Sequence, residues 1–367
     1  MKILQVIPTL DQSGAEKQFA ILSTGLPRDQ YDIRVVTLTR KGHYATAIGA
    51  AGIPIINLQK RWKFDPFSMQ RLKREINAFK PDIVHSWLFA ANAYVRLVSP
   101  KKRRHRIVVS ERCVDVWKAG WQKWLDRRLI AKTDALVGNS VSVTNFYREL
   151  GVPADKLSVI KNAVTLDETV SKVEARRELL AKYNLPEDAW LIVYAGRLAP
   201  QKRLPDLLWA IQVLRQIDPR AHLLIVGDGP LRSELELKAE RLECANFVRF
   251  LGHQPNVPGI LAAANCFWLG SEFEGMSNSL LEAMAAGLPV VVSDIPANRE
   301  LITHNQNGYV VKLGDGVGFA QFTNKLIQEP ETAARFGAAS KEQIHTEHSL
   351  ARMISEYETL YRRLQES

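Results

Sequence analysis

The stretch 271-SEFEGMSNSLLEAMAAGLPVVVSD-294 predicts, in this order, a loop, a helix, a tight stop and a buried strand. Ser277 or the residue after it can cap the helix, because their side-chain oxygens accept hydrogen bonds from first-turn amides. Gly287 suits a left-handed helix end, and Pro289 prevents the helix from continuing. The valines at 290–292 then predict a strand that is buried on both faces.

Two carboxylates frame this helix. Glu274 lies in the loop before it and Glu282 lies about one turn inside it, with seven residues between them. The helix N-terminus between the two acids offers amides and a positive dipole end to an anion. Carboxylates beside a bound anion can accept sugar hydroxyls, so the pattern suggests a nucleotide-sugar pocket. The candidate ligand contacts are Glu274, Gly275, Met276, Ser277, Asn278, Ser279, Leu280 and Glu282.

The segment resembles the Glu-x7-Glu signature of the retaining family-4 glycosyltransferases, which have the two-domain GT-B fold. The resemblance implies transfer of a hexose-type sugar from a nucleotide diphosphate sugar, with UDP as the expected nucleotide. It also implies a glycan or polyprenyl-linked acceptor in cell-envelope polysaccharide synthesis. In that family Glu282 would hold the ribose and Glu274 the hexose hydroxyls.

Strands and helices alternate along both halves of the chain, which predicts an α/β protein with two doubly wound, Rossmann-like domains. We expect an acceptor-binding domain at 1–165 and a nucleotide-sugar-binding domain at 166–345, facing each other across a cleft. A helical pattern at 346–367 is expected to pack back on the first domain.

A second motif suits a diphosphate. Gly196 follows an apolar strand, and Arg197 and Lys202 follow it five residues apart. Arginine can hold phosphate oxygens in two places and lysine adds a point charge. The run resembles the family motif Gly-Arg-Leu-x-x-x-Lys, which implies that both cations neutralise the leaving diphosphate. Together with Glu274 they are the predicted catalytic residues, and fixed cations would make a metal or other cofactor unnecessary.

Three further residues are expected at the donor. Gly14 lies in a run, Ser13 to Glu16, that resembles the family's Gly-Gly-x-Glu loop, with serine in place of the first glycine. Gly227 lies in a sharp turn after a buried strand. His253 follows a strand whose exit loop lies near the nucleobase in relatives.

The acceptor side is predicted from strand ends, because ligands of parallel sheets lie beyond the carboxyl ends of the strands. His85 ends one strand, and the alternative for it is a structural histidine. Glu111 and Arg112 end another, where many relatives carry a histidine that contacts the transferred sugar. Either Arg112 or Glu111 takes over that positioning, or the site differs from that of the relatives; the structural alternative is that Arg112 is only a surface or helix-dipole charge.

The charge is uneven, with 28 Lys and Arg against 13 Asp and Glu in residues 1–165 but 21 against 26 in the rest. A basic half should face an anionic partner. Within 101–132, Trp117, Trp121 and Trp124 recur at helical spacing among basic residues that include Lys118. This predicts peripheral contact with an anionic membrane, or a helix packed on its own sheet. No nucleic-acid motif accompanies the charge, so nucleic acid is not expected.

Composition sets the remaining expectations. Three widely spaced cysteines match no metal pattern and favour a reducing compartment. The start is too quickly polar for a signal peptide and no run is long enough to span a membrane, so we expect a cytoplasmic protein, peripheral on the inner membrane face. Two other functions stay open: a 2-epimerase-like isomerase of nucleotide sugars, and a non-catalytic protein that binds the membrane surface.

Overall fold

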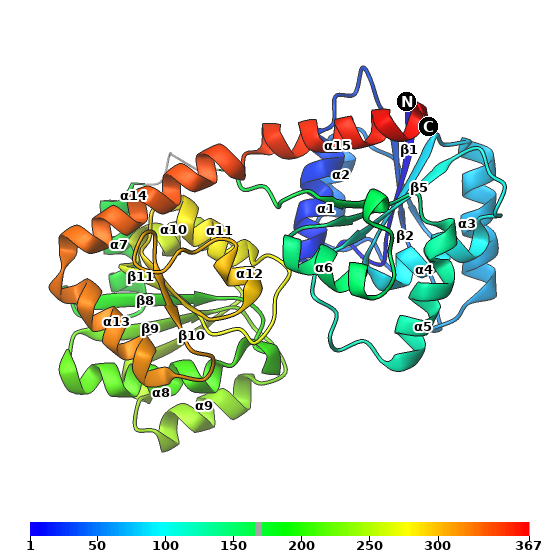
Figure 1. Cartoon of the computed structure of the whole chain (residues 1–367). Helices are drawn as coiled ribbons and strands as arrows, with labels where there is room; N and C mark the ends of the chain where they lie inside the picture. The colour runs from blue at the N-terminus through cyan, green and yellow to red at the C-terminus, as the bar shows by residue number, and fades with distance from the viewer. Residues whose placement is uncertain (166–170, 367) are drawn as a thin grey trace. The chain divides into compact units, whose positions relative to one another are not determined.

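The computed structural model describes residues 1–165 and 171–366. The chain divides into two compact units, Met1–Ala163 with His348–Ser367, and Val164–Glu347. The predicted start of the second domain, residue 166, lies outside the described residues. Each unit has a parallel sheet with helices on both faces (Figure 1). This arrangement confirms the predicted fold class of two Rossmann-like, doubly wound domains.

The first unit is built on a seven-stranded sheet with the order β3-β2-β1-β4-β5-β6-β7. Its strands are β1 Lys2–Ile7, β2 Asp32–Thr37, β3 Ile55–Asn57, β4 Ile83–Trp87, β5 Arg106–Glu111, β6 Ala135–Gly138 and β7 Leu157–Val159. The strand order reverses between β1 and β4, which is where open parallel sheets bind ligands beyond the strand ends.

Helices cover both faces of this sheet. They are α1 Gly14–Gly25, α2 Ala45–Ala50, α3 Pro66–Phe79, α4 Leu88–Val98, α5 Gly120–Leu129, α6 Val141–Glu149 and α15 Leu350–Glu366. Side chains of β1 alternate between two apolar cores, with Ile3 on the side of α1 and α15 and Leu4 on the side of α3, α4 and α6. Burial on both faces explains why the strands are continuous apolar runs.

Helix α15 belongs to the core of the first unit although it is the last element of the chain. Its buried stripe includes Met353, Tyr357, Leu360 and Tyr361, which repeat at helical spacing. His348, just before the helix, hydrogen-bonds through Nδ1 to the carbonyl of Asn162 at 2.9 Å. The end of the chain is thus fixed to the segment that leaves the first unit.

The second unit has six strands in the order β10-β9-β8-β11-β12-β13. They are β8 Trp190–Ala195, β9 Ala221–Val226, β10 Val248–Gly252, β11 Cys266–Leu269, β12 Val290–Ser293 and β13 Tyr309–Val311. The helices are α7 Lys172–Lys182, α8 Leu204–Ile217, α9 Arg232–Arg241, α10 Val257–Ala263, α11 Asn278–Ala285, α12 Pro296–Arg299, α13 Gly316–Gln328 and α14 Pro330–Glu347. Here the order reverses between β8 and β11.

The quoted stretch folds as its residues predict. Ser277 is the N-cap of α11, and its side chain accepts the amide of Leu280. Gly287 follows the helix in the left-handed region, at φ +72°. Strand β12 is buried along its whole length.

Two glycine loops of the second unit pack backbone to backbone. The amide of Gly196 donates to the carbonyl of Val226 at 2.9 Å, and that of Gly227 donates to Gly252 at 2.8 Å. Gly227 has φ +120°, and a Cβ there would overlap the carbonyl oxygen of Gly196. Only glycine lets the loops after β8 and β9 approach this closely.

We therefore expect Gly227→Ala to lower the free energy of unfolding by roughly 2 kcal/mol or more, because it adds both strain and a backbone clash. Urea denaturation measures the change. Gly49→Ala is the matched control, because a Cβ at Gly49 in α2 meets nothing within 4 Å. Equal stability of the two variants would show that the loop packing does not require glycine.

Candidate active site

The predicted donor residues of the second unit gather at the carboxyl ends of β8 and β11. The loop after β8 carries Arg197 and Lys202, and the loop after β11 carries Glu274. These strands are neighbours at the point where the strand order reverses. The structure therefore brings the two sequence motifs together at the place where an α/β sheet binds its ligand.

An ion pair joins the two loops. Nζ of Lys202 bonds Oε1 of Glu274, and the same oxygen accepts from Oγ of Ser271 at 2.7 Å. Gln201 joins the same two loops by two more hydrogen bonds. Its side-chain Nε2 donates to the carbonyl of Phe273 at 2.6 Å, and its backbone carbonyl accepts from the amide of Glu272 at 2.9 Å. An ammonium has three hydrogens, so Lys202 can bond Glu274 and an anion at once.

Residues behind the loop hold it in place. The hydroxyl of Ser293, at the end of β12, donates to the carbonyl of Ser271 at 2.5 Å. Nδ2 of Asn298 in α12 donates to the carbonyl of Ser293 at 2.9 Å. Ser271 and Asn298 had no predicted role, because their hydrogen bonds join positions that carry no motif. They keep the Glu274 carboxylate in one orientation.

The first turn of α11 follows Glu274 of this ion pair in the sequence. Its first intrahelical bond is donated by Leu281 to the carbonyl of Ser277, so the amides of Asn278 and Ser279 precede the helical bonding pattern. The amide of Leu280 is directed to Oγ of Ser277 at 3.4 Å. That geometry leaves Leu280 less suited to an anion than the prediction supposed.

The other predicted donor residues of this unit lie in adjacent loops. The carbonyl of Arg197 accepts from Tyr194 at 3.0 Å, and the arginine itself is exposed. Gly227 is in the loop after β9, and His253 is exposed in the loop after β10. The Gly229 amide and Arg232 lower the pKa of Asp228, and the nearby His253 adds a smaller effect in the same direction. Glu282 lies half-buried in α11.

Gly14 belongs to the first unit, where it is the first residue of α1. The hydroxyl of Ser13, its N-cap, donates to the carboxylate of Glu16, which also accepts from Thr9 at 3.3 Å. Burial raises the pKa of Glu16. Ser13 thus anchors the loop through its side chain, at the position that the Gly-Gly-x-Glu motif gives to its first glycine.

His85 is a core residue of the first unit, which argues against its predicted contact with an acceptor. Its side chain is fully buried. Nδ1 hydrogen-bonds the hydroxyl of Tyr361 at 2.7 Å and Nε2 that of Ser110 at 2.8 Å. Burial, with a smaller effect of Arg112, lowers its pKa to about 3. A neutral histidine with both nitrogens engaged fits the structural alternative.

Arg112 is not a surface charge. It is buried, its guanidinium stacks 4.5 Å from the ring centroid of Trp87, and Nη2 bonds the side chain of Asn162. Burial lowers its pKa. The Tyr357 hydroxyl lies near the guanidinium and acts to raise the pKa of Arg112. Among the described residues, Nε and Nη1 of Arg112 and Nε1 of Trp87 are nevertheless buried donors with no acceptor in good hydrogen-bond geometry.

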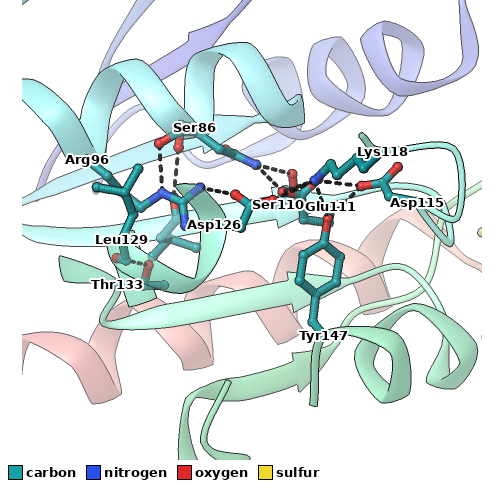
Figure 2. Close-up of polar contacts among 12 residues, drawn as sticks. Ser86, Arg96, Ser110, Glu111, Asp115, Lys118, Asp126, Leu129, Thr133 and Tyr147 are labelled. Carbon is teal, nitrogen blue, oxygen red and sulfur yellow. Dashed lines mark hydrogen bonds and ion pairs between the residues drawn. The ribbon is translucent and has the colours of Figure 1, made fainter. Parts of the chain in front are cut away.

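Glu111 is part of a buried charge network that the sequence did not predict (Figure 2). At its centre is Lys118, which lies 2.9 Å from Asp115, 3.0 Å from Asp126 and 3.6 Å from Glu111. Arg96 bonds Asp126 at 2.7 Å. All five charged side chains are at most 6% exposed. Lys118, which the sequence analysis counted among the basic residues of the tryptophan segment, is therefore buried and adds no charge to the surface.

The network has one more acid than it has cations. Burial raises the pKa of Glu111 to about 7, although Lys118 acts in the opposite direction. Burial would lower the pKa of Lys118, but the three carboxylates together raise it above its usual value. Between about pH 4.5 and 7 the network therefore keeps Glu111 protonated where a solvated carboxyl would be ionised, and the Glu111 side chain is only 3% exposed.

No helix in residues 1–165 and 171–366 combines the length and apolar character that crossing a bilayer requires. In the same two ranges, no group of three or more His, Cys, Asp or Glu side chains is arranged to hold a metal ion.

The network makes a pH prediction. A carboxyl whose pKa is raised by folding contributes stability that is complete below the unfolded pKa, near 4.5, and is lost as pH rises through about 7. Glu111→Gln keeps the shape without the charge. Wild type should therefore lose stability relative to Glu111→Gln as pH rises from about 4.5 to about 7. We expect the difference in free energy of unfolding to grow by on the order of 1 kcal/mol per pH unit, measured by urea denaturation. The exposed Glu149→Gln should follow wild type, and a parallel Glu111→Gln profile would contradict the prediction.

Comparisons with known proteins cover both units. Residues 12–168 match the family described as Glycosyltransferase Family 4, and residues 175–343 match Glycosyl transferases group 1. The lipopolysaccharide core biosynthesis glycosyltransferase LpsD of Rhizobium meliloti (strain 1021) is 28% identical over 293 residues, which are 80% of this chain and 78% of LpsD. The N-acetyl-alpha-D-glucosaminyl L-malate synthase of Bacillus anthracis is 29% identical over 233 residues, 63% and 60% of the two chains.

A solved structure shows the same fold. The crystal structure of HepE from Anabaena in complex with UDP-glucose superposes with a TM-score of 0.87 at 20% identity, covering 99% of this chain and 100% of HepE. The sequence motifs, the two doubly wound sheets and the matches to both halves agree. The chain belongs to the group 1, or family 4, glycosyltransferases, which are retaining enzymes with the GT-B fold.

Proposed function

We propose that this enzyme transfers a hexose from a UDP sugar to a lipid-linked glycan in cell-envelope polysaccharide synthesis. The observation that carries the donor part is the pair of loops joined by Lys202 and Glu274 at the reversal point of the second sheet. The HepE complex with UDP-glucose and the lipopolysaccharide role of LpsD support the donor and the acceptor class.

The cations and amides of the site act on the leaving group. Arg197 and Lys202, with the first-turn amides of α11, would stabilise the diphosphate as the sugar departs, and one such aimed donor is worth roughly 3 kcal/mol. Lys202 is fixed for this by its bond to Glu274. These groups stay in place throughout the reaction, so little reorganisation accompanies the development of charge.

The two glutamates and the loop glycines position the donor. Glu274 would accept hexose hydroxyls and Glu282 those of the ribose. Gly14, Gly196 and Gly227 would let the backbone approach the donor, and His253 would lie by the base. The bond from the anomeric carbon to the diphosphate breaks while the acceptor oxygen bonds the same face. The acceptor proton passes to the departing phosphate oxygen, so no side-chain base is needed.

Arg112 is the residue of the first unit best suited to a polar substrate group. Among the residues described, its Nε and Nη1, and Nε1 of Trp87, are buried donors with no acceptor in good hydrogen-bond geometry, although the Tyr357 hydroxyl lies nearby. A buried donor left unpaired costs about 1–3 kcal/mol, and a substrate oxygen would remove that cost. This favours Arg112 over His85 and Glu111 as the acceptor-side contact.

A thermal-shift comparison of UDP, GDP and ADP tests the donor site. A nucleotide at about 100 times its Kd should stabilise wild type by roughly 2.7 kcal/mol, and we expect UDP to do so. Arg197→Ala and Lys202→Ala each remove a charge-assisted hydrogen bond, so affinity should fall roughly tenfold or more.

Arg241→Ala is the control, because this exposed cation ends α9 at the opposite edge of the sheet. Unchanged UDP affinity in the two site variants would overturn the donor assignment. Incubation with UDP sugars then separates the reaction classes: conversion without any acceptor would indicate an isomerase. Transfer to a soluble hydroxy acid, as the name of the Bacillus anthracis relative implies for that protein, would replace the lipid-linked acceptor.

A further inference from the structure

A second exposed aromatic surface lies in the first unit, outside the 101–132 segment. Trp62, Phe64 and Phe67 are 58%, 63% and 64% exposed. They lie between the end of β3 and the first turn of α3, at the edge of the sheet where the strands end. Three large aromatic side chains so close together are costly in water, since each exposes an area that burial would stabilise.

The segment that carries them is rigidly built. The Asp65 carboxylate accepts from the amides of Arg61, Phe67 and Ser68 and from the Ser68 hydroxyl, at 2.8–3.2 Å. The amide of Asp65 donates to the hydroxyl of Tyr94 in α4 at 2.8 Å. The aromatic side chains are therefore held outward by a fixed backbone and are not simply unpacked.

Cations surround these aromatics. Residues 59–74 contain six Lys and Arg and a single acid, Asp65, whose carboxylate is consumed by the bonds above. Arg61 and Lys63 alternate with Trp62 and Phe64 and are also exposed. A small pocket in this segment is lined by two arginines, two aromatic rings, the hydrogen-bonded Asp65 carboxylate and two polar side chains: Arg61, Arg71, Trp62, Phe67, Asp65, Gln59 and Ser68. Two guanidinium groups beside aromatic rings suit a phosphate headgroup.

The tryptophan segment of 116–124 is held on the same helix. Val116, Trp117, Trp121 and Trp124 are 52–60% exposed, and Trp121 packs edge-to-face on Phe89 of α4, with ring centroids 5.8 Å apart. Lys118 of the buried network lies 4.8 Å from the Phe89 ring. Helix α4 thus supports both aromatic segments, one through Tyr94 and one through Phe89.

We propose that residues 61–67 insert into the surface of an anionic phospholipid bilayer and that, with the tryptophan segment, they dock the first unit at two points. The inference extends the proposed function, from which it takes the membrane as the site of the acceptor. Two separate contacts leave a unit on a plane free to rotate only about the line that joins them, whereas one contact lets it tilt in every direction. Aromatic rings would enter the interface while Arg61, Lys63 and Arg71 bind headgroup phosphates.

Sedimentation with vesicles tests this, using phosphatidylcholine alone and phosphatidylcholine mixed with phosphatidylglycerol. Wild type should bind the anionic vesicles and lose binding as salt increases. The variant Trp62→Ser, Phe64→Ser, Phe67→Ser should bind roughly tenfold or more weakly. A control with Trp209→Ser, Ile217→Ser and Leu237→Ser removes three exposed apolar side chains of the second unit and should bind as wild type does.

Wild type that stays in the supernatant, or a loop variant that binds like wild type, would overturn the proposal. The proposal would also be overturned if the double variant Trp121→Ser, Trp124→Ser lost vesicle binding while the triple variant Trp62→Ser, Phe64→Ser, Phe67→Ser (the loop variant) bound normally. UDP-induced thermal shift of the loop variant is measured in parallel. A preserved shift shows that the variant is folded. If wild type binds vesicles but shows no thermal shift with UDP, the proposed donor site is contradicted while the proposed docking surface is supported.

Discussion

The ion pair between Lys202 and Glu274 is the contact on which the candidate site depends. It joins the loop after β8 to the loop after β11, and these strands are neighbours because the strand order of the sheet reverses there. Each charge is costly to bury alone, so the pair holds both loops in the geometry that satisfies it. Ser271, Ser293 and Asn298 then fix the carboxylate from behind.

The first unit uses the same physics for another purpose. Lys118 pairs with three buried carboxylates and so fixes the chain between β5 and α5, which carries the exposed Trp117 and leads into the helix of Trp121 and Trp124. Removing one partner of such a cluster leaves an uncompensated charge, which costs several kcal/mol. The buried ion pairs of Lys118 thus keep this segment ordered although its large aromatic side chains face water.

Much of the fold and of the donor site follows from local patterns. A few neighbouring residues are enough to predict the cap at Ser277, the left-handed Gly287 and the buried strand β12. The loops that follow predicted strands carry Arg197, Lys202 and Glu274, so their place at the carboxyl ends of the strands could also be predicted. The buried network was not predictable, since Arg96, Glu111, Lys118 and Asp126 are joined only by the tertiary fold. For the same reason the sequence left two roles open for His85, an acceptor contact or a structural histidine: its partner Tyr361 lies 276 residues away.

A crystal structure of the whole chain with UDP would show whether the loops after β8 and β11 hold a nucleotide diphosphate sugar. We expect diphosphate oxygens within hydrogen-bonding distance of Arg197, Lys202 and the first-turn amides of α11, with the ribose at Glu282. A nucleotide bound elsewhere, or a diphosphate that touches neither cation, would contradict this expectation.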